Sequence, residues 1–267
     1  MTISVTIGPR LQTVASFVPK GAKLGDIGTD HAYLPIALFE KDQISKAVAV
    51  DVHEGPYQSA LSAVKGRHLE GIIDVRLGDG LMPLQPEEVN VLTLAGMGGK
   101  TMLDILSARP DVLESVTDLI VQPQGGEGVV RWTLMNAGWR LKAERLVKEE
   151  DRIYSVMAYS RIEGWEIAEL RKKEHVWNQR LAPLLESKLN LATETELRSL
   201  VHRLVWHFGP LVLEERSDLL RGYLDEYSGM LLRRREQMKN SKSTEITVKI
   251  REVSDELTLV EGLRIWQ

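Results

Sequence analysis

The chain has 267 residues, of which 43% are hydrophobic and 27% are charged, a composition typical of a packed globular protein and not of a disordered one. Its formal net charge is -4, so the chain as a whole is not basic, and contacts with a polyanion must come from local patches. Cysteine is absent, which excludes disulfides, thiolate metal sites and any mechanism with a cysteine nucleophile.

Neither a targeting signal nor a membrane signal is found in the sequence. Residues 1–10 lack a basic segment followed by an apolar core, so we expect no signal peptide. No apolar run reaches the length of about eighteen residues that a membrane-spanning helix needs. We therefore expect a soluble, cytoplasmic protein, which the absence of cysteine fits.

Short β-branched runs alternate with helical patterns from about residue 21 to residue 161, which is typical of β–α–β units and a mainly parallel sheet. We expect seven strands, at residues 23–27, 47–52, 73–77, 89–95, 118–122, 139–146 and 153–159. We expect helices at residues 31–39, 56–68, 100–107 and 128–137, preceded by a leading helix at residues 9–18. The last two strands lie close together in sequence and are expected to close the sheet as an antiparallel pair.

The character of the sequence changes near residue 163, where strand patterns end. We therefore divide the chain into an α/β domain at residues 1–162 and a helical domain at residues 163–267, with its first helices at 165–181 and 194–207. Two further amphipathic patterns run from Leu213 to Leu231 and from Ile246 to Val260, with a polar turn at residues 239–243 between them. This arrangement predicts an antiparallel coiled-coil hairpin.

The turn after the first expected strand reads Leu24-Gly25-Asp26-Ile27-Gly28-Thr29-Asp30. Gly25 and Gly28 permit a positive φ and let a ligand approach the backbone closely. The spacing is not the Gly-x-Gly-x-x-Gly that a dinucleotide needs for its pyrophosphate. An acidic turn instead suits a ligand with an ammonium and a sulfonium, such as S-adenosylmethionine, with Asp26 at the ammonium. Taken alone, the turn is equally compatible with an ordinary strand-to-helix connection.

Two further acids follow the second and third strands. Asp51 ends the second strand, where a carboxylate can accept both ribose hydroxyls, and Asp79 follows the third, where it can bind an adenine amine. Three acids at the carboxyl ends of successive strands lie at the edge where open α/β sheets bind ligands. The sequence thus predicts S-adenosylmethionine as cofactor, bound by Asp26, Gly28, Asp51, Val52, Asp79, Gly80 and Gly96.

A glycine-rich segment, Ala95-Gly96-Met97-Gly98-Gly99-Lys100, follows the fourth expected strand. Enzymes that methylate exocyclic amines often carry Asn/Asp-Pro-Pro-Tyr at this place, and that motif is absent. The glycines leave room for a flat group to lie against the backbone, with Met97 as an apolar contact. In isolation the segment also fits a glycine-rich turn before a helix.

Three segments together resemble the bacterial tRNA (adenine-22-N1)-methyltransferase family: residues 26–35, which read Asp-Ile-Gly-Thr-Asp-His-Ala-Tyr-Leu-Pro, residues 76–81 and residues 95–99. Pro9-Arg10-Leu11, Gln122-Pro123, Gly138-Trp139-Arg140 and Gly209-Pro210 are also similar to the family pattern, so the resemblance covers roughly residues 8–240. The chain departs from the family at two places. Gln124 stands where the family usually has Asn, and Asp51-Val52-His53 stands where it usually has Glu-Val-Asn.

The resemblance implies a Rossmann-like catalytic domain, a helical C-terminal domain and N1-methylation of adenine 22 in tRNA. Adenine N1 has a free lone pair at neutral pH, so we expect catalysis from base flipping, in-line placement of N1 and exclusion of water, without a general base. We assign the catalytic, positioning roles to Asp30 at the adenine amine, Tyr33 as a stacking or hydroxyl contact, and Met97.

Substrate contacts are expected from several other residues: Arg10, His31, Gln122, Pro123, Arg233, Arg234 and Arg235. The three consecutive arginines belong to a local basic excess, for which a solvated helix face is the alternative. Two other functions stay open: a small-molecule methyltransferase whose hairpin is a lid or dimer contact, and a non-catalytic cofactor-binding scaffold. Since no histidine stands at metal-ligand spacing, we expect no metal, and we expect a monomer or weak homodimer.

Overall fold

The computed structural model describes residues 5–185, 194–238 and 244–266, and the chain divides into two units, Met1–Glu166 and Ile167–Gln267. The first unit extends a few residues beyond the boundary that we placed after residue 162. The reason is a bridge between Leu141 and Trp165, whose backbone N–H groups donate to each other's carbonyl oxygens at 3.0 and 2.9 Å.

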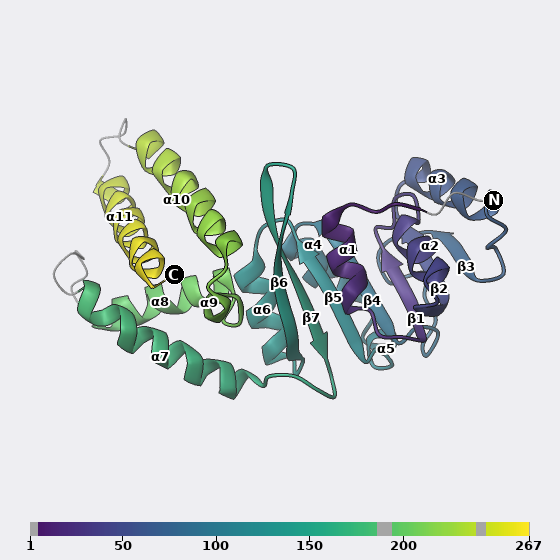
Figure 1. Cartoon of the computed structure of the whole chain (residues 1–267), viewed down its shortest axis with the longest axis horizontal. Coiled ribbons are helices and arrows are strands. Elements are labelled where there is room, and N and C mark those ends of the chain that lie inside the picture. Colours follow the sequence, from purple (N-terminus) through teal and green to yellow (C-terminus); the bar gives the residue numbers. More distant parts are fainter. Residues whose placement is uncertain (1–4, 186–193, 239–243, 267) are drawn as a thin grey trace. The chain divides into compact units, whose positions relative to one another are not determined.

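The first unit contains a seven-stranded sheet in the order β3-β2-β1-β4-β5-β7-β6 (Figure 1). The strands are β1 (Ala22–Ile27), β2 (Ile44–Asp51), β3 (Ile73–Leu77), β4 (Val91–Met97), β5 (Asp118–Pro123), β6 (Arg140–Glu149) and β7 (Arg152–Ser160). Strands β1 to β5 are parallel, whereas β7 pairs antiparallel with both β5 and β6. The predicted α/β fold, including the antiparallel pair that closes the sheet, is therefore confirmed.

Helices cover both faces of this sheet. They are α1 (Pro9–Phe17), α2 (Tyr33–Glu40), α3 (Glu54–Lys65), α4 (Gly99–Ala108), α5 (Pro110–Leu113) and α6 (Glu127–Asn136). Helices α1 to α3 share one apolar core with the sheet, to which they contribute Val14, Ile36 and Val64, each at most 1% exposed. Figure 1 shows α1 in front of the strands. Helix α4 packs against β4, α5 and α6. The short helix α5 was not predicted.

The connection between β3 and β4, residues 78–90, contains no helix, and the structure describes all of it. Side chains alternate between the two faces of a strand, so Leu24 and Ala47 enter the core with α1 to α3. Their sequence neighbours Lys23 and Lys46 point to the opposite face and are exposed. The polar face of β1 to β3 therefore lacks a covering helix from this connection.

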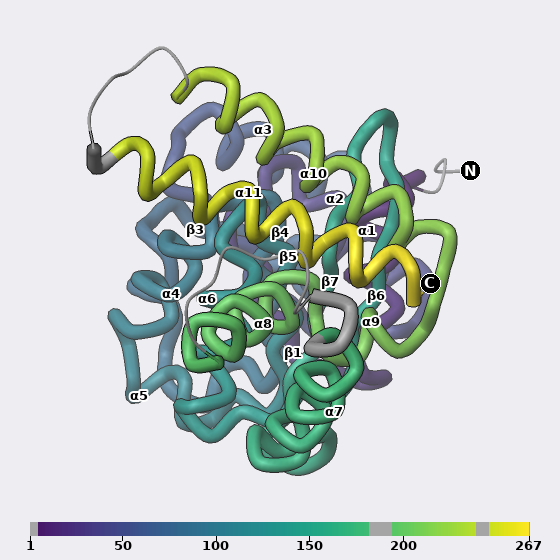
Figure 2. Tube along the Cα trace, turned by 90° about the vertical axis from the view of Figure 1, so that its left-hand side faces the viewer, coloured from purple at the N-terminus to yellow at the C-terminus, as the bar shows by residue number. Residues whose placement is uncertain are grey.

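The second unit is helical in all its described residues. It contains α7 (Ile167–Leu185), α8 (Glu194–Phe208), α9 (Val212–Glu215), α10 (Asp218–Met238) and α11 (Thr244–Ile265). Helices α10 and α11 pack side by side in opposite directions, as Figures 1 and 2 both show. The predicted polar turn at residues 239–243 lies outside the described residues. None of the helices among them is long and apolar enough to cross a membrane.

The first of the two paired helices begins later than the sequence pattern indicated. Leu213 belongs to α9, and Arg216, with a left-handed φ of 49°, separates it from α10. The remaining apolar positions of the pattern, such as Leu220 and Leu224, are buried. Tyr227 lies on the same helix, and its hydroxyl donates a hydrogen bond to Glu256 of α11 at 2.6 Å. The helix pair is thus held by apolar packing and by a polar contact.

A buried ion pair ties α6 to the antiparallel strands of the first unit. Arg131 of α6 pairs with Glu144 of β6, and both side chains are fully buried. Arg131 Nη2 also donates to Ser155 Oγ of β7 at 2.8 Å. Because a buried charge without its partner is costly, α6, β6 and β7 are expected to fold cooperatively.

We predict that Glu144→Gln lowers the free energy of unfolding by about 3–5 kcal/mol, since it removes the carboxylate charge that pairs with the buried Arg131. Urea unfolding followed by circular dichroism measures this loss. Glu166→Gln is the matched control, because Glu166 pairs with Arg140 at the surface and the change should cost less than about 1 kcal/mol. Equal losses in the two variants would contradict the structural role of the buried pair.

Candidate active site

The carboxyl ends of β1 to β4 surround a cavity of about 380 Å³. Strand order reverses between β1 and β4, which are neighbours in the sheet although β2 and β3 lie between them in sequence. Open α/β sheets bind their ligands outside the carboxyl ends of the strands at such a point. This first cavity is lined by several of the residues predicted from the sequence: Gly28, Asp51, Val52, Asp79, Gly80, Gly96 and Met97.

Asp51, the last residue of β2, is held in a fixed orientation. Its Oδ1 accepts the backbone N–H of His53 at 2.9 Å, and its Oδ2 accepts that of Asp30 at 3.3 Å. A carboxylate oxygen has more than one acceptor site, so both oxygens retain capacity for ligand hydroxyls. Asp79 is exposed at the start of the β3–β4 connection, in the lining of the same cavity.

Glycine is required at two positions of this lining. Gly28 has a φ of +75°, and a Cβ there would lie 2.9 Å from Met97 Cε. Gly80 has a φ of +52°, and a Cβ there would lie equally close to Ile105. Gly25, which we also expected at positive φ, is instead an ordinary strand residue, where a Cβ would lie 2.6 Å from Leu92 Cδ2. Its lack of a side chain serves packing between strands and not a turn.

Charge in the first cavity is negative. Asp51 and Asp79 line it, and in the part of the chain that the structure describes neither lysine nor arginine contributes to the lining. A pyrophosphate would therefore find no cationic side chain here. The cavity suits a ligand that carries hydroxyls, an amine and positive charge.

A second cavity, of about 280 Å³, shares Gly28, Ala95 and Gly96 with the first. The rest of its lining comes from α1, from β1, from the start of α2 and the turn before it, and from the residue after β5: Arg10, Leu11, Asp26, Thr29, Asp30, His31, Tyr33, Leu34 and Gln124. The predicted positioning groups are thus divided, because Asp30 and Tyr33 lie here whereas Met97 lines the first cavity. The two cavities meet at one wall of glycine and alanine backbone.

Aromatic rings stack at the second cavity. The rings of His31 and Tyr33 are 5.0 Å apart and nearly parallel, with an angle of 15°. Tyr33 is 41% exposed, so the stack is partly open to solvent. Asp30 and Ala32 both have left-handed φ values, 52° and 55°, before α2 begins at Tyr33. Non-glycine residues are strained in this region, and such strain is concentrated at functional sites.

Asp26 is buried between two threonines. Its Oδ2 accepts the hydroxyl of Thr29 and its Oδ1 accepts the hydroxyl of Thr93, both at 2.6 Å. Burial raises the pKa of Asp26, against the lowering effect of the two hydroxyls, and the nearby charge of Asp51 raises it further. We had predicted cofactor contact for this carboxylate, but it borders the second cavity and is absent from the described lining of the first.

Arg10 is held by partners that lie far away in the sequence. Its Nη1 donates to Gln122 Oε1 at 2.8 Å, and its Nε donates to Glu149 Oε2 at 3.1 Å. The Arg10 backbone N–H also donates to Glu149 at 3.2 Å. Arg10 was predicted to contact substrate, whereas Glu149 was missed. No local pattern points to Glu149, because it lies 139 residues from Arg10 and becomes its neighbour only through the fold.

For Gln122 and Pro123 we predicted direct contact with the substrate, and the structure places both residues away from the cavity linings. Both are buried, and neither lines either cavity among the described residues. Gln122 Nε2 donates to the carbonyl oxygen of Pro123 at 2.8 Å, and its Oε1 is occupied by Arg10. They support the wall of the second cavity from behind, through Arg10.

The predicted basic cluster lies on α10 of the second unit. Arg233 and Arg234 are exposed, whereas Arg235 is half-buried beside a groove of about 470 Å³ between α10 and α11. Among the described residues, no group of three histidine, aspartate or glutamate side chains is placed to hold a metal ion.

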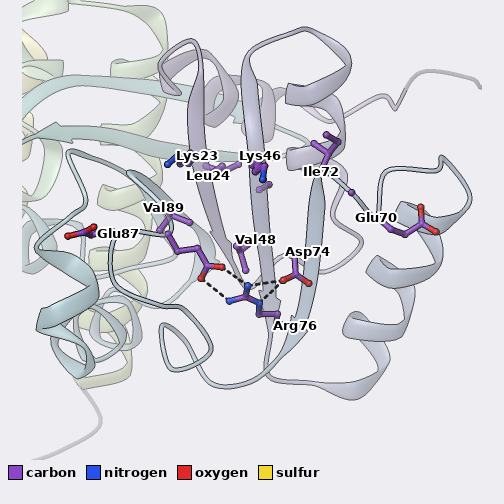
Figure 3. Close-up of a pocket in the computed structure, with 13 residues that line it drawn as sticks. Lys23, Leu24, Lys46, Val48, Glu70, Ile72, Asp74, Arg76, Glu87 and Val89 are labelled. Carbon is purple, nitrogen blue, oxygen red and sulfur yellow. Dashed lines mark hydrogen bonds and ion pairs between the residues drawn. The ribbon is translucent and has the colours of Figure 1, made fainter.

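A third cavity, of about 370 Å³, opens on the polar face of β1 to β3 (Figure 3). Arg76 dominates it, with its Nη1 bound to Glu88 at 2.8 Å and its Nε to Asp74 at 2.9 Å. The hydrogen bonds from Arg76 lower the pKa of Glu88. Arg76 also donates to the carbonyl oxygen of Pro83 at 2.7 Å, which anchors the loop that carries Asp79. Arg76 is thus paired with two carboxylates and with the loop before β4, so it braces the segment that carries Asp79.

Comparison with known proteins identifies related sequences. The family model described as "Methyltransferase domain" matches residues 7–157. The tRNA (adenine(22)-N(1))-methyltransferase of Bacillus subtilis is 38% identical over 151 residues, which are 57% of this chain. That match spans 63% of the Bacillus subtilis protein, so it leaves more than a third of the relative unmatched.

Solved structures are similar over nearly the whole chain. The Bacillus subtilis m1A22 tRNA methyltransferase TrmK is 26% identical with a TM-score of 0.76, and the match covers 97% of this chain and 99% of that one. Streptococcus pneumoniae Sp1610 in complex with S-adenosyl-L-methionine is 29% identical with a TM-score of 0.69, over 95% and 97% of the two chains.

We predict a pH signature for Asp26. Because its pKa is raised in the folded state, the folded chain holds this proton more tightly than the unfolded chain, whose aspartate pKa is about 3.9. The contribution of Asp26 to stability is therefore present at low pH and is lost as pH rises through the raised pKa. The free energy of unfolding of Asp26→Asn minus that of the wild type should rise over this interval and then level off.

Urea unfolding at a series of pH values from about 4 to 8 measures this difference. Asp151→Asn is the control, because it makes the same change at an exposed aspartate on the turn between β6 and β7. A flat difference for Asp26→Asn would show that burial does not perturb this carboxyl.

Proposed function

The chain belongs to the methyltransferase-domain family, and from this premise we propose that it methylates N1 of an adenine in tRNA with S-adenosylmethionine as donor. The observation that carries the proposal is the pair of cavities sharing Gly28, Ala95 and Gly96 at the carboxyl edge of the sheet. One cavity suits the donor and the other the target base. The Bacillus subtilis relatives are named for adenine 22, which makes position 22 the proposed target.

S-adenosylmethionine, when bound, supplies a methyl group attached to a positively charged sulfonium. Asp51 would hold its ribose hydroxyls, Asp79 its adenine amine, and the backbone of Val52 and Gly80 would border the adenine ring. The acidic lining fits a cationic ligand without phosphate. Gly28 and Gly96 keep the wall toward the second cavity free of side chains.

The second cavity would receive the target adenine after it leaves its stack. The partly exposed stack of the Tyr33 and His31 rings offers a platform for the base. Asp30 would accept a hydrogen bond from the adenine amine. No general base is needed, since N1 has a free lone pair at neutral pH, so these residues act by orienting the base and excluding water.

We also propose contacts with the phosphates of the tRNA backbone and a cytoplasmic location. Arg233 and Arg234 are exposed cations that would neutralise phosphates, with Arg235 beside them. Gln122 and Pro123 would act on substrate through the position of Arg10. A tRNA substrate and a chain without cysteine fit the cytoplasm. A monomer or weak homodimer stays our prediction for the oligomeric state.

The direct test is mass spectrometry of nucleosides from unmodified tRNA that has been incubated with the full chain and S-adenosylmethionine. We expect 1-methyladenosine, and its loss when adenine 22 is replaced by guanine. Asp51→Asn should lower kcat/KM for the cofactor by about 10- to 100-fold, because a charged acceptor is lost. Glu70→Gln, on the exposed side of the third cavity, should leave it unchanged. Cofactor binding without any methylated nucleoside would refute the proposed activity.

The arginine cluster makes a separate prediction. Arg233→Ala/Arg234→Ala should weaken tRNA binding and should reduce the slope of log K against log salt by about 1 for each phosphate that is no longer neutralised. Filter binding or fluorescence anisotropy at several salt concentrations measures both quantities. Lys20→Ala/Lys41→Ala is the matched control, since it removes two exposed cations from the first unit, away from both cavities. An unchanged salt slope in the arginine variant would assign the cluster to a solvated helix face.

A further inference from the structure

Gln124 is the first residue after β5, and its side chain is exposed at the second cavity. Its backbone N–H donates to the carbonyl oxygen of Met97 at 2.8 Å, which fixes its position against the end of β4. Within the described part of the chain, its carboxamide makes no hydrogen bond. A carboxamide with a free donor and a free acceptor, carried by an anchored backbone at a cavity, is equipped to recognise a ligand.

Gly96 lies beside this amide. A Cβ at Gly96 would lie 3.6 Å from Arg10 Nη1 and 3.9 Å from Gln124 Nε2. Glycine at this position therefore leaves a space bordered by Arg10 and Gln124. A flat ring that lay against the Gly96 backbone would have its edge near the carboxamide.

The chemistry of the reaction determines which edge of the adenine faces the carboxamide of Gln124. N1 has to face the methyl donor, so no protein group can stand in line with its lone pair. The N6–N7 edge remains free for recognition, and it offers one N–H donor and one acceptor. A carboxamide matches this pair, with Oε1 accepting from N6 and Nε2 donating to N7.

We propose that Gln124 recognises the target adenine by a two-point contact with its N6–N7 edge, an inference that rests on the proposed adenine methylation. The amine of adenine has two hydrogens, one on the N7 side and one on the N1 side. Gln124 takes the first and Asp30, in the same cavity, takes the second. Guanine presents two acceptors on this edge, O6 and N7, so its O6 meets the carboxamide oxygen and is rejected.

The experiment combines two substrates with matched enzymes. The substrates are tRNA with adenosine and tRNA with 7-deazaadenosine at the methylated position, the latter lacking the N7 acceptor. For the wild type, kcat/KM should be roughly 5- to 50-fold lower with 7-deazaadenosine. For Gln124→Ala, the two substrates should give equal values, both reduced. Comparing the two ratios cancels any change that the deaza substitution makes in the reactivity of N1.

Two further variants sharpen the test. Gln124→Glu keeps an oxygen acceptor for N6 but sets its other oxygen against the N7 lone pair, so it should lose or reverse the wild-type preference for adenosine over 7-deazaadenosine. Gln85→Ala, an exposed glutamine on the β3–β4 connection outside the described lining of both cavities, should keep the wild-type ratio. Thermal denaturation should be unchanged in Gln124→Ala, because the backbone bond to Met97 is retained.

The possible results distinguish the role of Gln124 from the proposed adenine methylation. Equal ratios in the wild type and Gln124→Ala would overturn the role of Gln124 and leave adenine methylation standing. A wild-type enzyme that methylates no adenine in tRNA would overturn the proposed function, and the role of Gln124 with it.

Discussion

The hydrogen bond between Asp26 of β1 and Thr93 of β4 joins the two strands at which the order of the sheet reverses. Both cavities are bordered by residues that follow these two strands. Strands β1 and β4 end beside each other, so the turn after one faces the glycine segment after the other. Thr29 holds the other oxygen of Asp26, which extends the same junction into the turn before α2. The buried carboxyl of Asp26 therefore connects β1, β4 and the turn before α2.

A second consequence of the junction is that donor and acceptor sites share a wall. Gly28 and Gly96 both have positive φ values, and neither presents a side chain to the cavities. The groups that would select a ligand stand around this bare wall: Asp51 and Asp79 on one side, Arg10, Asp30, Tyr33 and Gln124 on the other. Several are held by second partners, as Asp51 is by two backbone N–H groups and Arg10 is by Glu149. Ligand binding therefore does not have to order these side chains.

Local sequence patterns predicted the parts that depend on local physics. Alternating apolar runs located all seven strands, and the glycine spacing of the first turn located Gly28. The same reasoning assigned Gly25 to a turn, because a sequence does not distinguish a glycine needed for positive φ from one needed beside Leu92. Leu213 fitted the heptad pattern of α10, but it belongs to α9, because the left-handed residue Arg216 separates the two helices. Glu149 and Thr93 were beyond prediction, since only the finished sheet brings them to Arg10 and Asp26.

We expect the donor in the first cavity, with its reactive end toward the wall formed by Gly28 and Gly96. A crystal structure of the full chain with S-adenosylhomocysteine measures this most directly. We expect the ribose hydroxyls on the Asp51 carboxylate and the sulfur beside the shared wall, open to the cavity that contains Gln124. A ligand bound in the cavity around Arg76, or a sulfur turned away from the second cavity, would contradict the account.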